Sequence, residues 1–222
     1  MAGALIVAVP FGVTTAIFIV EALSFSIRDI TKSLIELLAS IPSIIYGFIG
    51  VLFLAPQIAS LFGLSSGTVA LTASIVLAIM TVPTIVSVSG ETIAAVPKEY
   101  KEAALALGAT KWQTIKSVVI PTAKSGILAS IMLGFGRAIG ETVAVLMVAG
   151  NVAVMPTPFW NFLSPVYTLT AAIAIQMGEA AVGTLECSAL FGLGLILFII
   201  TFVVNLLADV LSEIELKVRG GI

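Results

Sequence analysis

Two charged side chains, Arg137 and Glu141, interrupt an otherwise apolar run and are the residues of this sequence best suited to chemistry. The run covers residues 127–150 and reads ILASIMLGFGRAIGETVAVLMVAG. Each charge costs roughly 2.5–3.5 kcal/mol at the centre of a membrane helix. The spacing predicts that both side chains project from one face of a single helix, one turn apart and about half-way across it. We therefore expect the pair, with the adjacent Thr142, to face other helices or a water-filled path.

The chemistry available to this pair is the reversible binding of an oxyanion. A guanidinium presents a planar fork of donors and keeps its charge when it is desolvated. Glu141 would balance the charge of Arg137 when no anion is bound. The alternative is structural, namely an ion pair that fixes helix packing beside Gly136 and Gly140, whose spacing permits close approach of helices. The residues alone leave both interpretations open.

The composition identifies the setting as a membrane. Hydrophobic residues make up 59% of the 222 residues, charged residues 10%, and the mean hydropathy is +1.21, whereas soluble domains carry about 25% charged residues. The absence of His and the single Cys187 exclude His-based zinc sites and intrachain disulfides. No dense basic stretch suggests nucleic-acid binding, and no Walker-type loop occurs. We expect no cofactor and no catalytic site, with any ATP bound by a separate subunit.

Five segments are long and apolar enough to span a bilayer, which predicts an all-α membrane protein. They cover roughly residues 3–24, 34–56, 68–90, 122–149 and 188–209. A sixth apolar stretch, 165–182, is short and contains Gln176, Gly178 and Glu179. We interpret it as a re-entrant or external-face helix, which is tolerated where protein buries its ends. No second domain is indicated, so residues 1–222 are expected to form one transmembrane domain.

The charged connections predict one orientation for all five spans. Basic residues occur between the first and second spans, between the third and fourth, and in the tail at Lys217 and Arg219, whereas the segments around 57–67 and 150–164 carry no charge. The positive-inside rule places these basic segments and the C-terminus in the cytoplasm and the N-terminus outside. The N-terminus lacks the basic flank of a cleavable signal peptide.

The long loop 97–121 has its own helical pattern. A strong helix-forming run follows Pro97, Gly108 is placed to end it, and a second short helix of roughly 110–119 is expected to stop at Pro121. Periodicity alone suits an amphipathic connector between two spans. Small residues on one face would also allow close approach of a partner.

This loop resembles the EAA motif of ABC importer permeases. The matching residues are Glu102, Ala103, Ala104, Gly108 and Pro121, at the family's spacing, with Val118 and Ile120 as conservative departures. The resemblance implies a MetI-like core of about five transmembrane helices in which this loop is a cytoplasmic coupling helix. There it would dock on an ATPase and move as a rigid body during the ATP cycle.

A second pattern narrows the resemblance. The run GRAIGETVAVLMVAGN at 136–151, supported by IELLASIPSIIYGFIG at 35–50, is similar to phosphate-specific transport permeases of the PstC type. This implies an importer of inorganic phosphate in a prokaryotic inner membrane. Its partners would be a PstA-like second permease or a homodimer mate, a PstB-like ATPase dimer and a PstS-like external phosphate-binding protein. PstC-type proteins usually carry a further N-terminal helix, so a truncated or naturally short form is expected.

Other functions compete with this interpretation. A permease for sulfate or molybdate is the nearest, although Glu141 would favour a protonated phosphate over fully ionised sulfate. An ion-coupled secondary transporter would use Glu141 as its coupling carboxylate, but such proteins usually contain internal repeats, and no convincing repeat is present. An intramembrane hydrolase is disfavoured by the lack of His.

Overall fold

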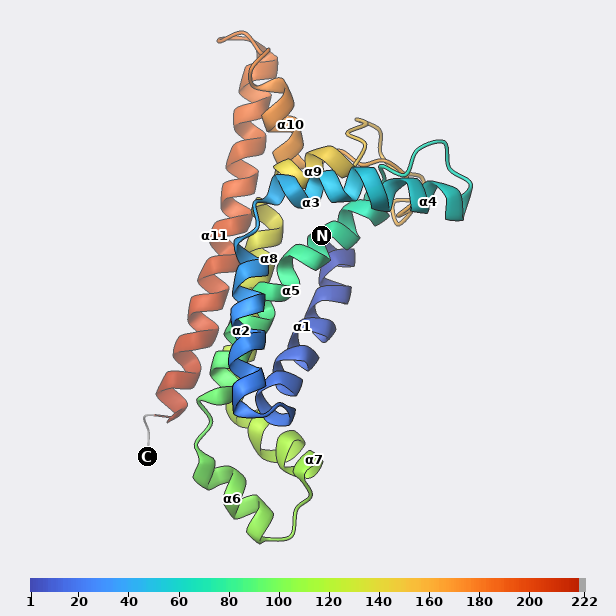
Figure 1. Ribbon diagram of the computed structural model, residues 1–222. Helices are drawn as coiled ribbons and strands as arrows, with labels where there is room; N and C mark the ends of the chain where they lie inside the picture. The colour runs from blue at the N-terminus through green and yellow to red at the C-terminus, as the bar shows by residue number, and fades with distance from the viewer. Residues whose placement is uncertain (220–222) are drawn as a thin grey trace. The chain divides into compact units, whose positions relative to one another are not determined.

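The computed structural model describes residues 1–219, nearly all of the ordered elements being helices (Figure 1). The helices are α1 (Ala2–Ala22), α2 (Phe25–Ser40), α3 (Ser43–Ile49), the π-helix η1 (Gly50–Leu54), α4 (Ala55–Phe62), α5 (Ala70–Ala94), α6 (Lys98–Ala106), α7 (Lys111–Thr114), the π-helix η2 (Ile115–Val119), α8 (Ile120–Gly140), α9 (Val143–Val148), α10 (Leu169–Gln176) and α11 (Leu185–Arg219). Five described helical segments are long and apolar enough to cross a membrane: Ala2–Ala22, Ser43–Phe62, Ala70–Ala94, Lys111–Gly140 and Leu185–Leu207. The predicted all-α membrane fold with five spans is confirmed.

The chain forms two compact units, each drawn from distant parts of the sequence. The first unit contains residues 1–7, 41–80 and 136–204, and the second contains residues 8–40, 81–135 and the end of α11 from Asn205. Helices α1, α5, α8 and α11 contribute residues to both units. The predicted single domain over 1–222 stays a prediction, and the side chains of Lys217 and Arg219 lie outside the described residues.

The first unit is centred on a contact between α3 and α9, which lie side by side in Figure 1. Gly47 makes this contact possible, because a Cβ at that position would lie 3.1 Å from the Cα of Ala144 and 2.6 Å from the sulfur of Met147. One turn further on, a Cβ at Gly50 would lie 2.7 Å from Val148. The glycines therefore bring α3 and η1 against α9.

The second unit is held together by a close contact between α5 and α8. Three small residues of α8, four positions apart, face α5: Gly126, Ser130 and Gly134. A Cβ at the first would lie 2.1 Å from Thr92, the second shares a 2.6 Å hydrogen bond with Ser89, and a Cβ at the third would lie 2.8 Å from Ile85. We call these six residues the α5–α8 contact. The predicted small-residue approach at Gly136 and Gly140 is not found at Gly140, where a Cβ would meet open space.

Two π-helical turns accommodate two of the prolines that lie inside helical rods. Each turn ends two residues before a proline, η1 before Pro56 and η2 before Pro121. The residue preceding each proline donates to the carbonyl five positions back, Ala55 to Gly50 and Ile120 to Ile115. The wider turn makes room for the pyrrolidine ring, which would clash with a carbonyl in regular α geometry.

The expectation that Pro121 stops a short helix is therefore wrong. Helix α7, η2 and α8 follow one another without interruption, and the span runs from Lys111 to Gly140. A proline in the first turn of α8 loses one N–H donor, and the π-turn before it absorbs the steric cost. The loop is thus joined directly to a membrane helix.

The predicted second span, 34–56, is also corrected. Helix α2 ends at Ser40, and Pro42 is the N-cap of α3. The residue before a proline is driven out of the helical region, so Ile41 breaks the rod. The span begins at Ser43, while α2 is a separate amphipathic helix in which no described residue is buried.

The stretch 165–182 agrees with its prediction as a non-spanning segment. Its helix, α10, covers only Leu169–Gln176, 8 residues, far fewer than the about 20 that a bilayer requires. Thr168 caps its start by accepting a hydrogen bond from the N–H of Ala171 at 3.3 Å. Whether this helix lies on the external face stays a prediction.

Candidate functional site

Arg137 and Glu141 do not lie on one continuous helix. Helix α8 ends at Gly140, and Glu141 and Thr142 lie between α8 and α9. The expectation that the two charges project from one helical face, half-way along a span, is wrong, because Arg137 occupies the last turn of α8. Glycine is a poor helix former, and the break falls directly after it.

Glu141 stabilises the start of α9. Its side-chain Oε1 accepts a hydrogen bond from the N–H of Ala144 at 3.0 Å. Its main-chain carbonyl accepts a second bond from the hydroxyl of Thr170, on α10, at 3.2 Å. A carboxylate at a helix N-terminus satisfies an otherwise unpaired donor and complements the helix dipole. Glu141 therefore links the helix break to α9 and α10.

The same carboxylate lines a small cavity of about 160 Å³ in the first unit. Its polar side chains are those of Glu141, Ser74 and Thr168, and the remaining walls come from Met1, α5, α9 and the segment before α10. The hydroxyls of Thr168 and Thr170 lie 3.2 Å apart at its edge. The cavity places a carboxylate and hydroxyl groups together beside the helix break.

Arg137 carries the positive charge of this region. Its side chain is half-buried, and a cation in the last turn of α8 is favoured by the helix dipole. Its charge acts electrostatically on Tyr46 of α3, which is buried within the first unit. Thr142 is half-buried and donates to the carbonyl of Gly140 at 3.3 Å. The three predicted site residues thus cluster at the end of α8, and their contact with a substrate stays a prediction.

The Gly-Asn pair that ends the 136–151 run has a structural role. Gly150 has φ +84° and Asn151 has φ 51°, so both lie in the left-handed region. A Cβ at Gly150 would lie 2.5 Å from the carbonyl oxygen of Thr68. The side-chain amide of Asn151 donates to the carbonyl of Leu146 at 2.6 Å, which satisfies the end of α9. This part of the run therefore ends α9 and fixes the chain after it close to Thr68.

The loop 97–121 forms the expected helix–turn–helix. Gly108, with φ +87°, ends α6: its N–H donates to Leu105 at 2.9 Å, and the N–H of Ala109 donates to Ala104 at 3.1 Å. These two bonds form a Schellman motif. Thr110 and Gln113 then make a reciprocal capping box that starts α7. The prediction that Gly108 ends the first helix is confirmed.

The EAA residues lie on a helix that presents an open face. No described residue of α6 is buried: Glu102 and Ala103 are exposed and Ala104 is half-buried. Leu107, at the end of the helix, is 89% exposed. A helix of this kind offers small and apolar groups to a partner.

An ion pair fixes α6 to the first span. The ammonium of Lys101 donates to Oε1 of Glu21, on α1, at 2.6 Å. The two side chains are only 22% and 12% exposed, so this charge-assisted bond is far less screened than a surface pair. Sequence reasoning missed it, because nothing in the spacing of these residues indicates that they meet.

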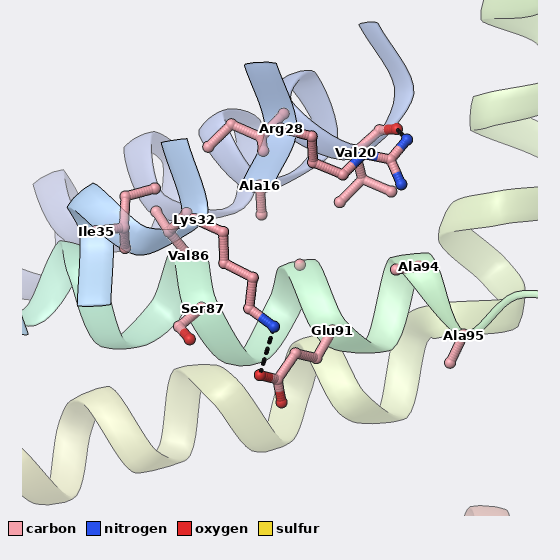
Figure 2. Close-up of a pocket in the computed structure, with 12 residues that line it drawn as sticks. Ala16, Val20, Arg28, Lys32, Ile35, Val86, Ser87, Glu91, Ala94 and Ala95 are labelled. Atoms are coloured by element: carbon pink, nitrogen blue, oxygen red, sulfur yellow. Dashed lines mark hydrogen bonds and ion pairs between the residues drawn. The ribbon is translucent and has the colours of Figure 1, made fainter. Parts of the chain in front are cut away.

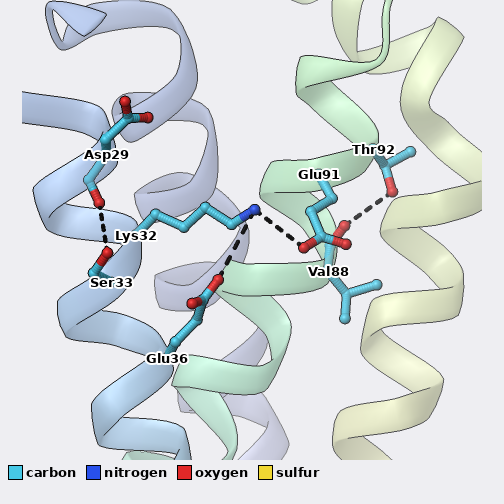
Figure 3. Close-up of polar contacts among 7 residues, drawn as sticks. All are labelled: Asp29, Lys32, Ser33, Glu36, Val88, Glu91 and Thr92. Carbon is cyan, nitrogen blue, oxygen red and sulfur yellow. Dashed lines mark hydrogen bonds and ion pairs between the residues drawn. The ribbon is translucent and has the colours of Figure 1, made fainter. Parts of the chain in front are cut away.

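A separate cavity of about 350 Å³ lies within the second unit beside α2 (Figure 2). Arg28 reaches Val20 and donates to its carbonyl, which caps the last turn of α1. Lys32 spans from α2 to Glu91 on α5 at 3.3 Å and also approaches Glu36 at 3.9 Å (Figure 3). These side chains are about half exposed, so the pairs contribute little, about 0–1 kcal/mol each.

Sequence reasoning missed Tyr46, Ser74, Thr168 and Thr170. Uncharged residues inside or beside apolar helices carry no spacing signal of their own. The Thr-Leu-Thr before an apolar run at 168–170 does match a helix N-cap pattern, and this signal could have placed Thr168 at the start of a helix.

The fold and the site define a membrane transport permease: several spanning helices, a helix break lined by polar groups, and a helical loop with an open face. The family described as "Binding-protein-dependent transport system inner membrane component" matches residues 8–214. The chain belongs to this family and is an inner-membrane permease component of a binding-protein-dependent ABC transport system.

Curated relatives confirm the resemblance to permeases of the PstC type. The chain is 40% identical over 209 residues to the probable ABC transporter permease protein YqgH of Bacillus subtilis, covering 94% of this chain and 66% of that protein. It is 40% identical over 224 residues to the phosphate transport system permease protein PstC of Mesorhizobium japonicum, covering 92% and 67%. The PstC of Haemophilus influenzae is 37% identical over 236 residues, covering 98% and 73%. The chain spans about two thirds of the length of these relatives.

Solved structures share the fold at low identity. The methionine ABC transporter MetNI in an inward-facing conformation has a chain with TM-score 0.65 and 17% identity, covering 96% of this chain and 87% of that one. A bacterial ABC transporter for import of the polysaccharide alginate matches with TM-score 0.63 and 14% identity, covering 96% and 77%. These likenesses confirm a MetI-like permease fold.

Proposed function

We propose that this chain is a permease subunit of an ATP-driven importer of inorganic phosphate. The observation that carries the proposal is the open face of α6 with its EAA residues, joined through α7 and η2 to a span whose last turn carries Arg137. Relatives in several bacteria are named phosphate transport permeases, which supports the choice of substrate.

The proposed assembly has four kinds of component. This chain pairs with a second permease, either PstA-like or another copy of itself, and two ATPase subunits bind ATP and dock on Glu102–Gly108. An external phosphate-binding protein delivers the substrate. The chain itself has no catalytic site and no cofactor, and its basic loops and C-terminus face the cytoplasm. The alginate transporter, solved together with its substrate-bound periplasmic protein, offers a precedent for such an assembly.

The coupling route follows from the uninterrupted rod. Movement of α6 and α7 enters α8 without a break at Pro121 and reaches Arg137 in the last turn. The Lys101–Glu21 ion pair carries the same movement to α1. A rigid-body displacement at the ATPase would thereby shift the helix break.

The substrate path is proposed to pass Arg137, Glu141 and Thr142. Arg137 supplies the fork of donors for phosphate, and Thr142 supplies a hydroxyl. One carboxylate oxygen of Glu141 caps α9, which leaves the other for a hydrogen bond from protonated phosphate. Arg137→Lys should lower uptake if two-point binding matters and leave it nearly unchanged if only charge matters.

Uptake of labelled phosphate into vesicles tests the proposed function. The chain is reconstituted with the candidate second permease, ATPase and binding protein, and uptake is measured with ATP, without ATP and with a proton gradient alone. We expect uptake only with ATP and with all components present. Uptake driven by the gradient alone would refute an ABC mechanism and favour an ion-coupled transporter.

The substrate is tested in the same vesicles by ATP hydrolysis. The binding protein is loaded in turn with phosphate, sulfate or molybdate, and we expect phosphate to give the largest stimulation. Stimulation by sulfate or molybdate instead would keep the permease assignment and replace the substrate. Glu141→Gln should weaken the exclusion of sulfate, with assembly checked by co-purification; unchanged exclusion would remove Glu141 from the selectivity role.

A further inference from the structure

The connection between α9 and α10 exposes an unusual amount of apolar surface. Its exposed large residues are Val152, Val154, Met155, Phe159, Trp160 and Phe162. The sequence between Glu141 and Glu179 contains no Asp, Glu, Lys or Arg. Contiguous apolar surface of this kind in a folded protein marks contact with a partner or a membrane.

Both ends of this connection are fixed to the first unit. Gly150 and Val166 form a parallel β-bridge, and the N–H of Val166 donates to Ala149 at 2.9 Å. Close to the other end, the carbonyl of Ser164 accepts from the first residue of α5, Ala70, at 3.0 Å. The carbonyl of Phe162 accepts from Leu71 at 2.7 Å. The connection therefore caps the N-terminus of a membrane-spanning helix and cannot move away from it.

A tight turn presents two aromatic rings at the tip. The N–H of Asn161 donates to the carbonyl of Pro158 at 2.9 Å, so Phe159 and Trp160 are the central residues of a β-turn. Their ring centroids lie 4.8 Å apart in an edge-to-face arrangement. Phe159 is 74% exposed and Trp160 is 64% exposed. The turn holds the pair outward as one apolar group with a polar indole N–H.

The geometry limits how far this tip can lie from the hydrocarbon edge. Trp160 is two residues from Phe162, and two residues of extended chain cover at most about 7 Å. The headgroup layer on each side of a bilayer is itself roughly 5–8 Å thick. Since Phe162 is bonded to the first turn of the α5 span, Trp160 lies within or beside that layer. Trp and other aromatic residues are enriched at this level of membrane proteins.

We propose that residues 152–160 form an interfacial anchor, which inserts Phe159 and Trp160 into the lipid headgroup region at the N-terminal end of α5. The absence of charge favours lipid over a charged protein surface, and the amphipathic indole suits the boundary between tails and headgroups. The anchor would hold the α5 end, and the Glu141 cavity beside it, at a constant depth. It requires only that the chain spans a membrane and does not depend on phosphate as substrate.

Tryptophan fluorescence tests the anchor directly, because the chain has only two tryptophans. Trp112→Phe leaves Trp160 as the single emitter, and the matched control Trp160→Phe leaves Trp112, which is similarly exposed at 67% and is the second residue of α7. The full-length chain is placed in phosphatidylcholine vesicles in which part of the lipid carries bromine at a defined acyl position. We expect Trp160 emission to be blue-shifted and quenched at least about twofold by bromine near the headgroup, and less by bromine near the bilayer centre.

Emission at the wavelength of indole in water, with strong quenching by aqueous iodide and none by brominated lipid, would overturn the anchor. So would a blue shift that develops only when a second permease or the binding protein is added, since that would assign the tip to a protein partner. A nitroxide at position 155, introduced as Met155→Cys in a Cys187→Ser background, gives a second measurement. Its collision rate should be higher with oxygen than with an aqueous nickel complex, and the reverse order would contradict the proposal.

Discussion

Helix α8 is held in two different ways along its length. In the second unit, Gly126, Ser130 and Gly134 press it against α5, with contacts that leave no room for a larger side chain. In the first unit the helix ends after Arg137. The helix that follows, α9, depends on a hydrogen bond that Glu141 accepts at its start and one that Asn151 donates at its end. One half is positioned by shape, the other by a few polar groups.

The difference assigns separate mechanical roles to the two regions. Tightly packed interiors transmit strain and deform little, so the α5–α8 contact suits the transmission of a displacement from α6. Short helices joined by capping bonds open at lower cost, so the break between α8 and α9 suits a gate. Function should therefore be lost when a larger side chain is added at the α5–α8 contact. At the break it should be lost when a backbone conformation is disturbed or a polar side chain is removed.

The largest effect is expected at Gly150. Gly150→Ala combines a left-handed φ of +84° with a Cβ 2.5 Å from the carbonyl of Thr68, and a backbone atom cannot rotate away. We expect a loss of about 3 kcal/mol in the free energy of unfolding, measured by thermal unfolding in detergent.

Gly183→Ala is the matched control for this substitution. Gly183 has φ +90° but open space around it, so the control isolates the conformational cost, about 1 kcal/mol. Equal losses for the two variants would show that the approach of Gly150 to Thr68 is unimportant.

Gly126→Ala probes the α5–α8 contact. The added Cβ would lie 2.1 Å from Thr92, a side chain that can move in part, so we expect a loss of about 2–3 kcal/mol and a matching loss of assembled transporter. Gly192→Ala in α11 meets open space and serves as control. Thr92→Ala should restore part of the stability in the double variant. A Gly126→Ala protein as stable as its control would contradict transmission by close packing.

Gly150 and Gly126 illustrate how much of the structure could be predicted from the sequence. Hydropathy extends over whole spans, so the five helices and the helical loop with its stop at Gly108 were predictable. The function of a single glycine depends on which atom faces it, and the sequence pointed to Gly136 and Gly140 rather than Gly126 and Gly134.

The candidate site shows the same limit. An apolar run without proline predicts one helix through residue 149, whereas α8 ends at Gly140 and Glu141 caps the start of a separate helix, α9. Its residues were found because a charge in an apolar run is costly, whereas its hydroxyl groups carry no such signal. Their geometry depends on α9 and α10, which the sequence does not place beside α8.

The Lys101–Glu21 pair tests whether α6 acts through α1. Lys101→Glu brings two carboxylates together in a mostly buried position and should cost about 2 kcal/mol, with a fall in ATP-driven uptake. The exchanged double variant, Lys101→Glu with Glu21→Lys, should recover most of both. Lys32→Glu, at an exposed pair of α2, is the control and should have little effect. If the exchange restores stability but not uptake, the ion pair holds α6 against α1 but does not transmit the movement of α6 to α1.

Two substitutions of Glu141 distinguish the effect of its hydrogen bond to α9 from the effect of its charge. Glu141→Gln keeps an oxygen that can accept from Ala144, whereas Glu141→Ala removes it and should cost about 1 kcal/mol. Stability should therefore fall only in the Ala variant, measured again by thermal unfolding. Equal destabilisation by both substitutions would mean that charge, rather than the hydrogen bond to α9, is what the break requires.

The smallest effect is expected inside the α5–α8 contact itself, at Ser89. Both hydroxyls of the Ser89–Ser130 pair are fully buried, and they lie 2.6 Å apart. Ser130 also donates to the carbonyl of Ile127 at 2.7 Å, so Ser89→Ala leaves that hydroxyl with a partner and should cost only about 0.6 kcal/mol. Ser89→Val at the same position adds volume to a dry contact and should cost several times more. A larger loss for Ala than for Val would mean that polarity, not close packing, joins these two helices, and the contrast between the two halves of α8 would fail.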